Sequence, residues 1–311
     1  MQVVPKGVRL VSCETLQLIY EYLAPRTVTV AVGSNDQIVL ALTGGEIIYL
    51  EVDLKGTLVQ KSSTSLDQDI ACLSLYESNI SEDHDMVDQC RSTILAVGMW
   101  TDNSVRLFAL QTLQELTRTQ LGAETQAQAR DVILVALGES SAVNVYLIIG
   151  LGDGTLITFV VDLLDGLPKL TNRRKVVLGT HPISLTSFNH AGSPCVFASC
   201  DRPTVLSTLN GKLIFSAVNI PEQTGMSTFH SELFPDCLAL SSEIGLMIGM
   251  VDEIQRLHVQ THPMGESPRR IAHCRQSGAY AGETSGFALL HYQILHALQT
   301  VLNILCKEIL F

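Results

Sequence analysis

The sequence predicts an all-β fold organised as a β-propeller, and three observations lead to this prediction. Short apolar runs are paired around polar turns, as in β-hairpins. Such a hairpin occurs at five places, and successive turns lie about 40 to 57 residues apart, the period of a four-stranded propeller blade. The chain is 46% hydrophobic but only 5% aromatic. We therefore expect an aliphatic core of the kind that β-branched strands build.

The clearest hairpin lies at residues 94–110. A continuous apolar run leads through Gly98 into a polar turn, and a second run then alternates from Val105 to Leu110. The continuous run is typical of a strand covered on both faces, whereas alternation predicts a half-buried second strand. One hairpin would be marginal alone in water, so the repetition is what predicts a stable fold.

The other elements are predicted in chain order on the same grounds. Further hairpins are expected at residues 37–52, 146–161, 195–209 and 237–251. Inner strands should precede the hairpins at residues 69–76, 131–137 and 183–188. Polar outer strands, whose charges discourage edge-to-edge pairing, are expected at residues 114–121 and 169–178. Together these elements predict a partial, WD40-like propeller of about five blades, without the strict motif of WD repeats.

The composition restricts the function classes. A net charge of −11 gives no overall electrostatic footprint for a phosphate backbone, so direct nucleic-acid binding is not expected. No apolar run is long enough to cross a bilayer, and the first residues do not resemble a signal peptide, so no membrane partner is expected. The eight cysteines form no CxxC pair, which favours free thiols in a reducing compartment.

Motifs for catalysis or metal binding are absent from the sequence. The glycine-rich residues 150–155 precede a strand rather than a helix, which indicates a hairpin turn instead of a phosphate loop. His258 and His262 match no usual zinc spacing, and the acidic residues 77–88 lack the order of a calcium loop. No nucleophile elbow appears. We expect neither an enzyme nor a cofactor or metal ion.

Surface residues remain as candidates. Trp100, the only tryptophan, lies at a turn between two strands, where it either folds over its own blade or anchors a partner. Two basic clusters indicate either solvated surface or nucleic-acid contacts, and they contain Arg173, Arg174 and Lys175, and Arg269 and Arg270. Few aromatic residues lie nearby to stack bases, which favours solvated surface.

Four segments carry a family resemblance: residues 96–116, 150–182, 197–220 and 249–271. They resemble the large subunit of the damaged-DNA-binding complex, the adaptor family of cullin-4 RING ubiquitin ligases. This family is related to the large subunit of the cleavage and polyadenylation factor and to a splicing factor 3b subunit. The resemblance runs from about residue 8 to about residue 271 and covers most of the second of the family's three propellers.

The resemblance implies a non-enzymatic scaffold acting in protein ubiquitination and the DNA damage response, in the nucleus and the cytoplasm. In the family the second propeller holds the N-terminal region of cullin-4, and the other two form a cleft for WD-repeat substrate receptors. This chain is not expected to bind those receptors. Trp100, Thr101 and Asp102 match the family's turn, which we expect to face the cullin. The alternative is a nucleic-acid-binding module of an RNA-processing complex.

The resemblance also implies three regions. Residues 1–262 would be an incomplete second propeller, residues 263–280 a connector with the first strand toward a missing third propeller, and residues 281–311 a tail outside the family. Within this tail, apolar residues at three- and four-residue spacing over 287–309 predict an amphipathic helix. The tail either comes from a truncated or mis-spliced gene model, caps the open propeller, or binds a membrane or a partner.

Overall fold

The structure is a computed structural model, and it describes most of the first 251 residues and two short stretches after them. The described residues are 1–12, 15–53, 55–77, 91–122, 127–139, 142–163, 167–190, 192–209, 211–232, 237–242, 245–251, 268–274 and 279–284. The helix predicted over residues 287–309 lies outside them, as do His258, His262 and most of the acidic run 77–88.

Six antiparallel sheets, here called blades 1 to 6, form the unit Met1–Gln255. Blade 1 is β1 (Gln2–Val4), β2 (Gly7–Val11) and β3 (Leu18–Leu23). Blade 2 is β4 (Val28–Ser34), β5 (Gln37–Leu42), β6 (Glu46–Val52) and β7 (Leu58–Ser65). Blade 3 is β8 (Ile70–Glu77), β9 (Ser92–Met99), β10 (Ser104–Ala109) and β11 (Gln114–Gln120).

The second half of this unit repeats the pattern. Blade 4 is β12 (Ala129–Glu139), β13 (Ala142–Leu151), β14 (Thr155–Asp162) and β15 (Lys169–Val177). Blade 5 is β16 (Ser184–His190), β17 (Ser193–Ser199), β18 (Thr204–Leu209) and β19 (Lys212–Ala217). Blade 6 is β20 (Gly225–Phe229), β21 (Cys237–Ser242) and β22 (Gly245–Gly249).

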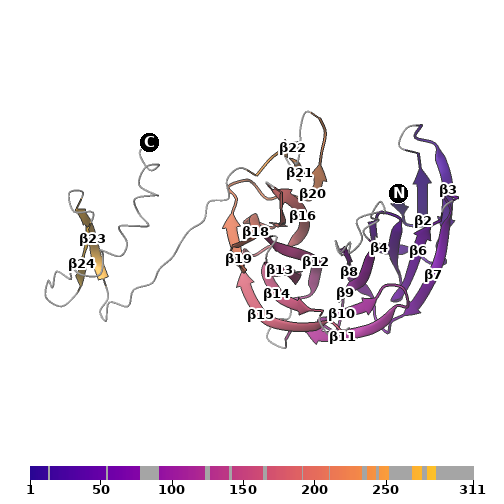
Figure 1. Ribbon diagram of the computed structural model, residues 1–311, viewed down its shortest axis with the longest axis horizontal. Coiled ribbons are helices and arrows are strands. Elements are labelled where there is room, and N and C mark those ends of the chain that lie inside the picture. Colours follow the sequence, from indigo (N-terminus) through magenta and orange to yellow (C-terminus); the bar gives the residue numbers. More distant parts are fainter. Residues whose placement is uncertain are drawn as a thin grey trace. The chain divides into compact units, whose positions relative to one another are not determined.

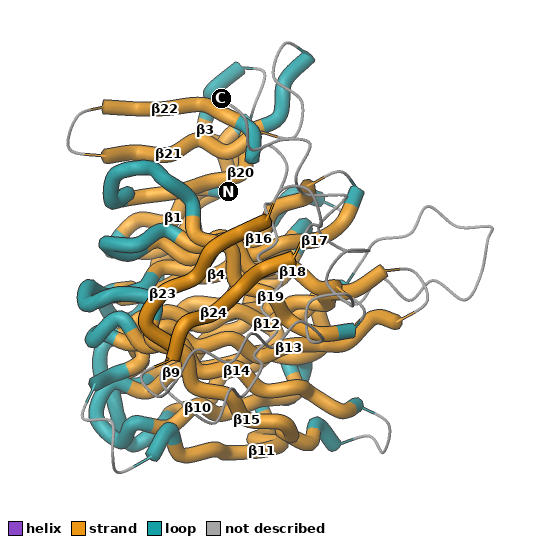
Figure 2. The backbone as a smooth tube through the Cα atoms, turned by 90° about the vertical axis from the view of Figure 1, so that its left-hand side faces the viewer, coloured by secondary structure: helices purple, strands orange, loops and turns teal. Residues whose placement is uncertain are grey.

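Strands follow chain order within each blade, and the first strands of successive blades meet. β4 contacts β8, β8 contacts β12, β12 contacts β16, and β16 contacts β20, while β7, β11, β15 and β19 lie on the outside (Figure 1). Strands, loops and turns account for the described residues (Figure 2). The described part of the chain contains no helix long and apolar enough to cross a membrane.

The unit Arg256–Phe311 is described only at one hairpin. β23 (Pro268–Cys274) pairs antiparallel with β24 (Ala279–Thr284). Arg269 and Arg270 lie on β23, and Arg270 is opposite Glu283 in the backbone register.

The hydrophobic core is divided into five clusters, each of which fills the space between two consecutive blades. β5 shows how this works, because Ile38, Leu40 and Leu42 face blade 1 whereas Val39 and Ala41 face blade 3. Every residue of β5 is buried. The prediction that continuous apolar runs form strands covered on both faces is therefore confirmed.

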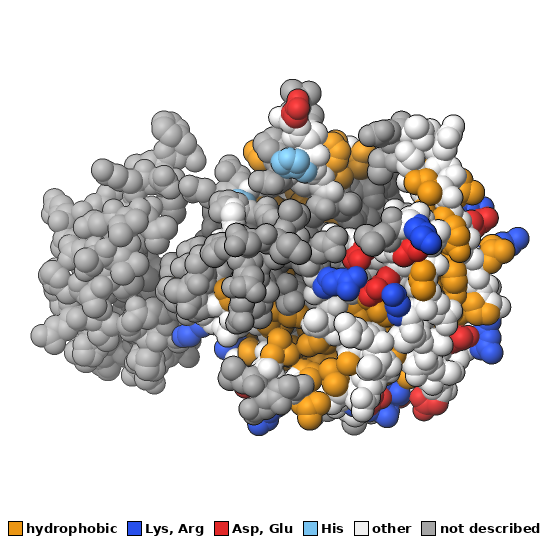
Figure 3. Space-filling model, turned by 45° about the vertical axis from the view of Figure 1, so that its right-hand side comes forward, with side chains coloured by type: hydrophobic (Ala, Val, Ile, Leu, Met, Phe, Trp, Pro, Cys, Tyr) orange, Lys and Arg blue, Asp and Glu red, His pale blue; other side chains and the backbone are white. Residues whose placement is uncertain are grey.

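The first and last blades are less covered than the four between them. Blade 1 exposes Leu18, Ile19 and Leu23, and Figure 3 shows hydrophobic side chains that reach the surface between charged ones. In blade 6 all five residues of β22 are exposed. These two blades also have three described strands each, whereas blades 2 to 5 have four.

The all-β fold and the predicted hairpins are confirmed, but the predicted number of about five blades is wrong, because the structure has six. The missed blade is blade 1, because β1 and β2 have only 3 and 5 residues and are too short for a clear apolar run, although β3 itself is rich in apolar residues. The expectation that the strand after the Trp100 turn is half-buried is also wrong. β10 is buried along nearly its whole length, since Val105 and Leu107 face blade 4 while Phe108 faces blade 2.

Four of the cysteines behave as core residues. Cys72, Cys195, Cys200 and Cys237 are free thiols and are buried in or beside strands. Burial raises the pKa of the Cys72, Cys195 and Cys200 thiols, which keeps them protonated near neutral pH.

A matched pair of glycine substitutions tests the turn geometry. Gly154 and Gly192 both have φ near +77°, with values of 78° and 76°. A Cβ on Gly154 would meet the backbone oxygen of Gly179 at 2.3 Å, whereas a Cβ on Gly192 would meet nothing within 4 Å. Urea unfolding should show a loss of about 1 kcal/mol for Gly192→Ala, from backbone strain alone. Gly154→Ala should lose clearly more, and equal losses would contradict the close contact.

Candidate partner-binding surface

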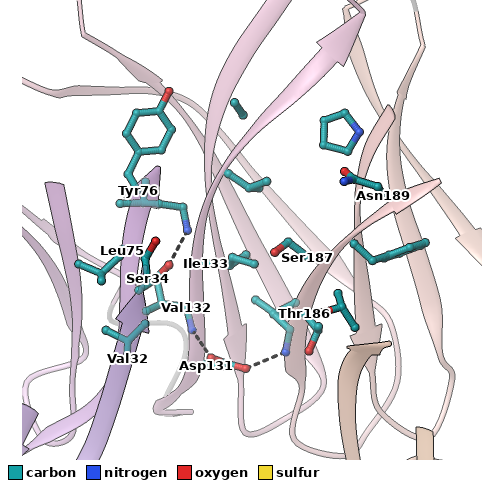
Figure 4. A pocket seen from close by; sticks show the side chains of 18 of the residues that line it. Val32, Ser34, Leu75, Tyr76, Asp131, Val132, Ile133, Thr186, Ser187 and Asn189 are labelled. Carbon is teal, nitrogen blue, oxygen red and sulfur yellow. Dashed lines mark hydrogen bonds between the residues drawn. The ribbon is translucent and has the colours of Figure 1, made fainter. Parts of the chain in front are cut away.

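A central cavity of about 1090 Å³ is lined by the inner strands of blades 2 to 6 (Figure 4). Its polar side chains include Ser34, Ser74, Asp131, Thr186 and Asn189. Two of them join neighbouring blades. The Leu134 amide donates to Ser74 Oγ at 3.0 Å, and the Leu185 amide donates to Asp131 Oδ2 at 2.7 Å. The cavity wall is thus held together by the side chains that would otherwise be available to a ligand.

Asp131 is the ionisable group in this wall that is most perturbed. Its second oxygen, Oδ1, accepts a hydrogen bond from the Val132 amide at 2.9 Å. Burial raises the pKa of Asp131 to about 6, although both amide bonds act in the opposite direction. Within the described residues no group of three or more His, Cys, Asp or Glu side chains is arranged to hold a metal ion. Asp131 is therefore not part of a metal-binding cluster among these residues.

The turn between β9 and β10 presents Trp100 to solvent. The Trp100 amide donates to the carbonyl of Asp69 at 3.0 Å, which ties the turn to the start of the inner strand. Asn103 closes the turn at φ 49°, a left-handed conformation that Asn tolerates well. Trp100 is 38% exposed, so its ring is neither buried in the blade nor free of contacts.

Arg130 fixes the Trp100 ring from the neighbouring blade. The Arg130 guanidinium carbon lies 5.5 Å from the ring centroid, within the range of a cation–π contact. The stem of Arg130 passes close to Gly152, because a Cβ there would lie 3.6 Å from Arg130 Cγ. The turns of blades 3 and 4 are therefore joined through a single arginine, which presents the aromatic ring on a fixed support.

Asp102 stabilises the same turn through its side-chain hydrogen bonds. Its Oδ1 accepts the amide of Ser104 at 3.0 Å, and its Oδ2 accepts Arg106 at 2.9 Å and Arg118 at 2.6 Å. The side chains of Asp102 and Arg106 are only 12% and 5% exposed. Burial alone would raise the pKa of Asp102, but the bonds from Ser104 and Arg106 outweigh burial and lower it.

The three residues matched to the family's turn differ in their surroundings. Trp100 is exposed and Asp102 is committed to two arginines, while Thr101 is exposed and donates to Gln68 Oε1 at 2.6 Å. Sequence reasoning missed Arg130, which completes the surface. The sequence places Arg130 directly before the predicted inner strand at residues 131–137, but it does not show that Arg130 lies near Trp100, because that contact depends on the packing of two blades.

The basic residues of β15 do not form one patch. Arg173 donates to the carbonyl of Leu121, in blade 3. Arg174 is opposite Thr158 and lines a small cleft toward blade 5, whereas Lys175 is opposite Ile157, which packs in the core between blades 3 and 4. The contiguous cluster of the sequence is therefore split between two sides of blade 4.

Comparison with known proteins identifies the propeller. Residues 1–251 match the family described as the RSE1/DDB1/CPSF1 second beta-propeller. The chain belongs to this family. The match covers all six blades, so the family resemblance expected from the four sequence segments is confirmed.

Relatives in the family are much longer than this chain. DNA damage-binding protein 1 of Solanum lycopersicum is 41% identical over 283 residues, which are 90% of this chain and 24% of that protein. DNA damage-binding protein 1a of Arabidopsis thaliana is 41% identical over 282 residues. DNA damage-binding protein 1 of Drosophila melanogaster is 36% identical over 286 residues, which are 24% of that protein. These names describe DNA damage-binding proteins and state no enzymatic activity.

The raised pKa of Asp131 predicts a specific pH dependence. At pH values between 3.8, the ordinary pKa of Asp131, and about 6, its pKa in the folded chain, the carboxyl is protonated in the folded chain and ionised in the unfolded chain. The stability from this carboxyl is fully present below pH 3.8 and declines as pH rises through 6, by roughly 3 kcal/mol. Asp131→Asn should remove this decline in the free energy of unfolding. Asp153→Asn, at an exposed turn, should retain it, and equal pH profiles for wild type and Asp131→Asn would contradict the assignment.

A second pair of substitutions tests the support under Trp100. Asp102→Ala leaves the 5% exposed Arg106 without its nearest carboxylate and should cost about 3 kcal/mol of unfolding free energy. Glu21→Ala breaks the more exposed pair with Arg9, whose side chains are 44% and 33% exposed, and should cost about 0.5 kcal/mol. Urea denaturation at neutral pH measures both, and a cost for Asp102→Ala as small as that for Glu21→Ala would show that the turn does not depend on this ion pair.

Proposed function

We propose that this chain is a scaffold propeller of a cullin-4 RING ubiquitin ligase and docks the N-terminal region of the cullin. The proposal places it in protein ubiquitination and in the DNA damage response, in the nucleus and the cytoplasm. Membership of the family and its relatives named DNA damage-binding protein 1 support the adaptor class. The choice of cullin-4 as the partner rests on the family resemblance described in the sequence analysis.

The proposed location of the docking site rests on the exposed ring of Trp100. Tryptophan is among the residues that most often dominate a protein interface, and such residues are surrounded by contacts that exclude water. Here the ring is held by Arg130 and its turn by Asp102, so little conformational freedom remains to be lost on binding. Thr101 and Gln68 lie beside it and supply a polar rim.

The alternative of a nucleic-acid-binding module receives no support from the arrangement of the described cations. A binding track along a phosphate backbone needs cations on one continuous surface. Arg173 is bound to a carbonyl in blade 3, while Arg174 and Lys175 lie on opposite sides of blade 4. The adaptor proposal therefore has the stronger basis.

The length of the chain restricts the proposal further. It spans 24% of the length of its relatives. In the family that the sequence resembles, substrate receptors bind between the first and third propellers. We accordingly assign cullin docking to this chain and assign the binding of WD-repeat receptors to other parts of longer family members.

Binding to a cullin-4 N-terminal fragment tests the proposal. Trp100→Ala should weaken binding by about 2 kcal/mol or more, roughly thirtyfold in Kd, because an interface aromatic is truncated. Leu167→Ala removes another exposed apolar side chain, 61% exposed, and is the matched control. It should leave Kd unchanged.

Calorimetry on the full chain, with circular dichroism to confirm folding, gives both results. A wild-type chain that folds but does not bind the cullin fragment would overturn the proposed function. Binding that is equally strong in wild type and Trp100→Ala would retain the function but remove Trp100 from the docking site.

A further inference from the structure

A small cleft opens between the outer parts of blades 4 and 5, away from the Trp100 turn. Its lining includes Tyr146, Thr158, Asn172, Arg174 and Lys212, and it encloses about 20 Å³. That volume accommodates one water-sized group. Lys212 follows the turn between β18 and β19, at the opposite end of the strands from the turns that correspond to Trp100. The cleft and the proposed cullin site are therefore separate.

Arg174 lines this cleft from β15, next to a β-bulge. In the pairing of β14 with β15, Thr158 is opposite Arg174 and Val160 is opposite Thr171, so two residues face Phe159 alone. The first of them, Asn172, has φ 51°. Because consecutive residues of a strand point to opposite faces, Arg174 shares with its partner Thr158 the face toward blade 5, whereas Arg173 contacts blade 3.

Two buried hydroxyls in the cleft have no partner. Tyr146 and Thr158 are 5% and 2% exposed, yet neither hydroxyl makes a hydrogen bond to any described residue. Neither oxygen is sealed off from solvent, so both remain available from the cleft. Both hydroxyls can therefore donate to an acceptor bound in the cleft, with a net gain of about 1 kcal/mol each over the water that the acceptor displaces.

The charges of the cleft are also uncompensated. Neither Arg174 nor Lys212 has an ion pair among the described residues, and no Asp or Glu lines the cleft. This is unexpected in a chain with a net charge of −11. Two cations, two hydroxyl donors and an amide converge on one small space. We propose that this cleft binds a single phosphate monoester.

A monoester fits the cleft better than the diester backbone of a nucleic acid. A monoester carries up to two negative charges on three terminal oxygens, which accept from arginine, lysine and hydroxyl donors at once. A diester chain would need further cations in line with Arg174, but Arg173 and Lys175 lie on the other side of blade 4. The enclosed space of about 20 Å³ admits one oxygen, and the proposal places the other oxygens at the mouth of the cleft, where Arg174 and Lys212 are exposed.

Calorimetric titration of the full chain with inorganic phosphate and with a short phosphoserine peptide tests this proposal at low ionic strength. Both ligands should bind, and the unphosphorylated peptide should not. The double substitution Arg174→Gln and Lys212→Gln should weaken binding at least tenfold. Lys175→Gln removes a neighbouring charge of the same strand from the other side and should change Kd less than twofold.

Two isosteric substitutions separate this site from general attraction between charges. Tyr146→Phe and Thr158→Val remove the hydroxyls but keep the net charge, and each should weaken phosphate binding about threefold to tenfold. Equal binding to wild type and the Arg174/Lys212 double variant would overturn the proposal. So would single-stranded RNA that binds more tightly than the phosphopeptide and depends equally on Lys175.

These outcomes are independent of the cullin test. Trp100→Ala should bind phosphate as the wild type does, because its turn lies at the other end of the strands. Loss of phosphate binding in Trp100→Ala alone, with the fold intact, would contradict the placement of the site.

Discussion

The packing of each blade against the next is the constraint on which this fold depends. Strands such as β5 are buried along their whole length, with alternate residues belonging to different interblade clusters. A single blade would therefore expose two apolar faces, and its stability comes from its neighbours. The aliphatic composition, 46% hydrophobic and 5% aromatic, suits this flat sheet-on-sheet packing.

Polar side chains between the inner strands then fix how the blades meet. Ser74 and Asp131 each accept an amide from the next blade, and Gln37 both donates to and accepts from the backbone of Ser92. Ser74 and Asp131 line the central cavity, whereas Gln37 is buried between β5 and β9. Groups available to partners therefore lie elsewhere, at the Trp100 turn held by Arg130 and in the cleft that Arg174 and Lys212 line.

Much of the fold could be predicted from local pattern, because β5, β9 and β13 are continuous apolar runs next to clear turns. Blade 1 was missed because β1 and β2 are too short, at 3 and 5 residues, to form such a run. Only the part of the site formed by residues adjacent in the sequence was predicted. The turn around Trp100 could be predicted in this way, whereas Arg130 contacts Trp100 only because blades 3 and 4 pack together. Conversely, Arg173 and Arg174 are adjacent in the sequence but lie on opposite sides of blade 4, because side chains alternate along a strand.

Within the described unit the blades form an array whose covering decreases from the middle toward blades 1 and 6. Cooperativity in such an array decreases from the middle outward, because β22 has solvent on both faces while β9 and β13 have a blade on each side. Local opening should start at blades 1 and 6. A surface that is to stay rigid is best placed on blades 3 to 5, and Trp100, Arg130, Arg174 and Lys212 all lie there.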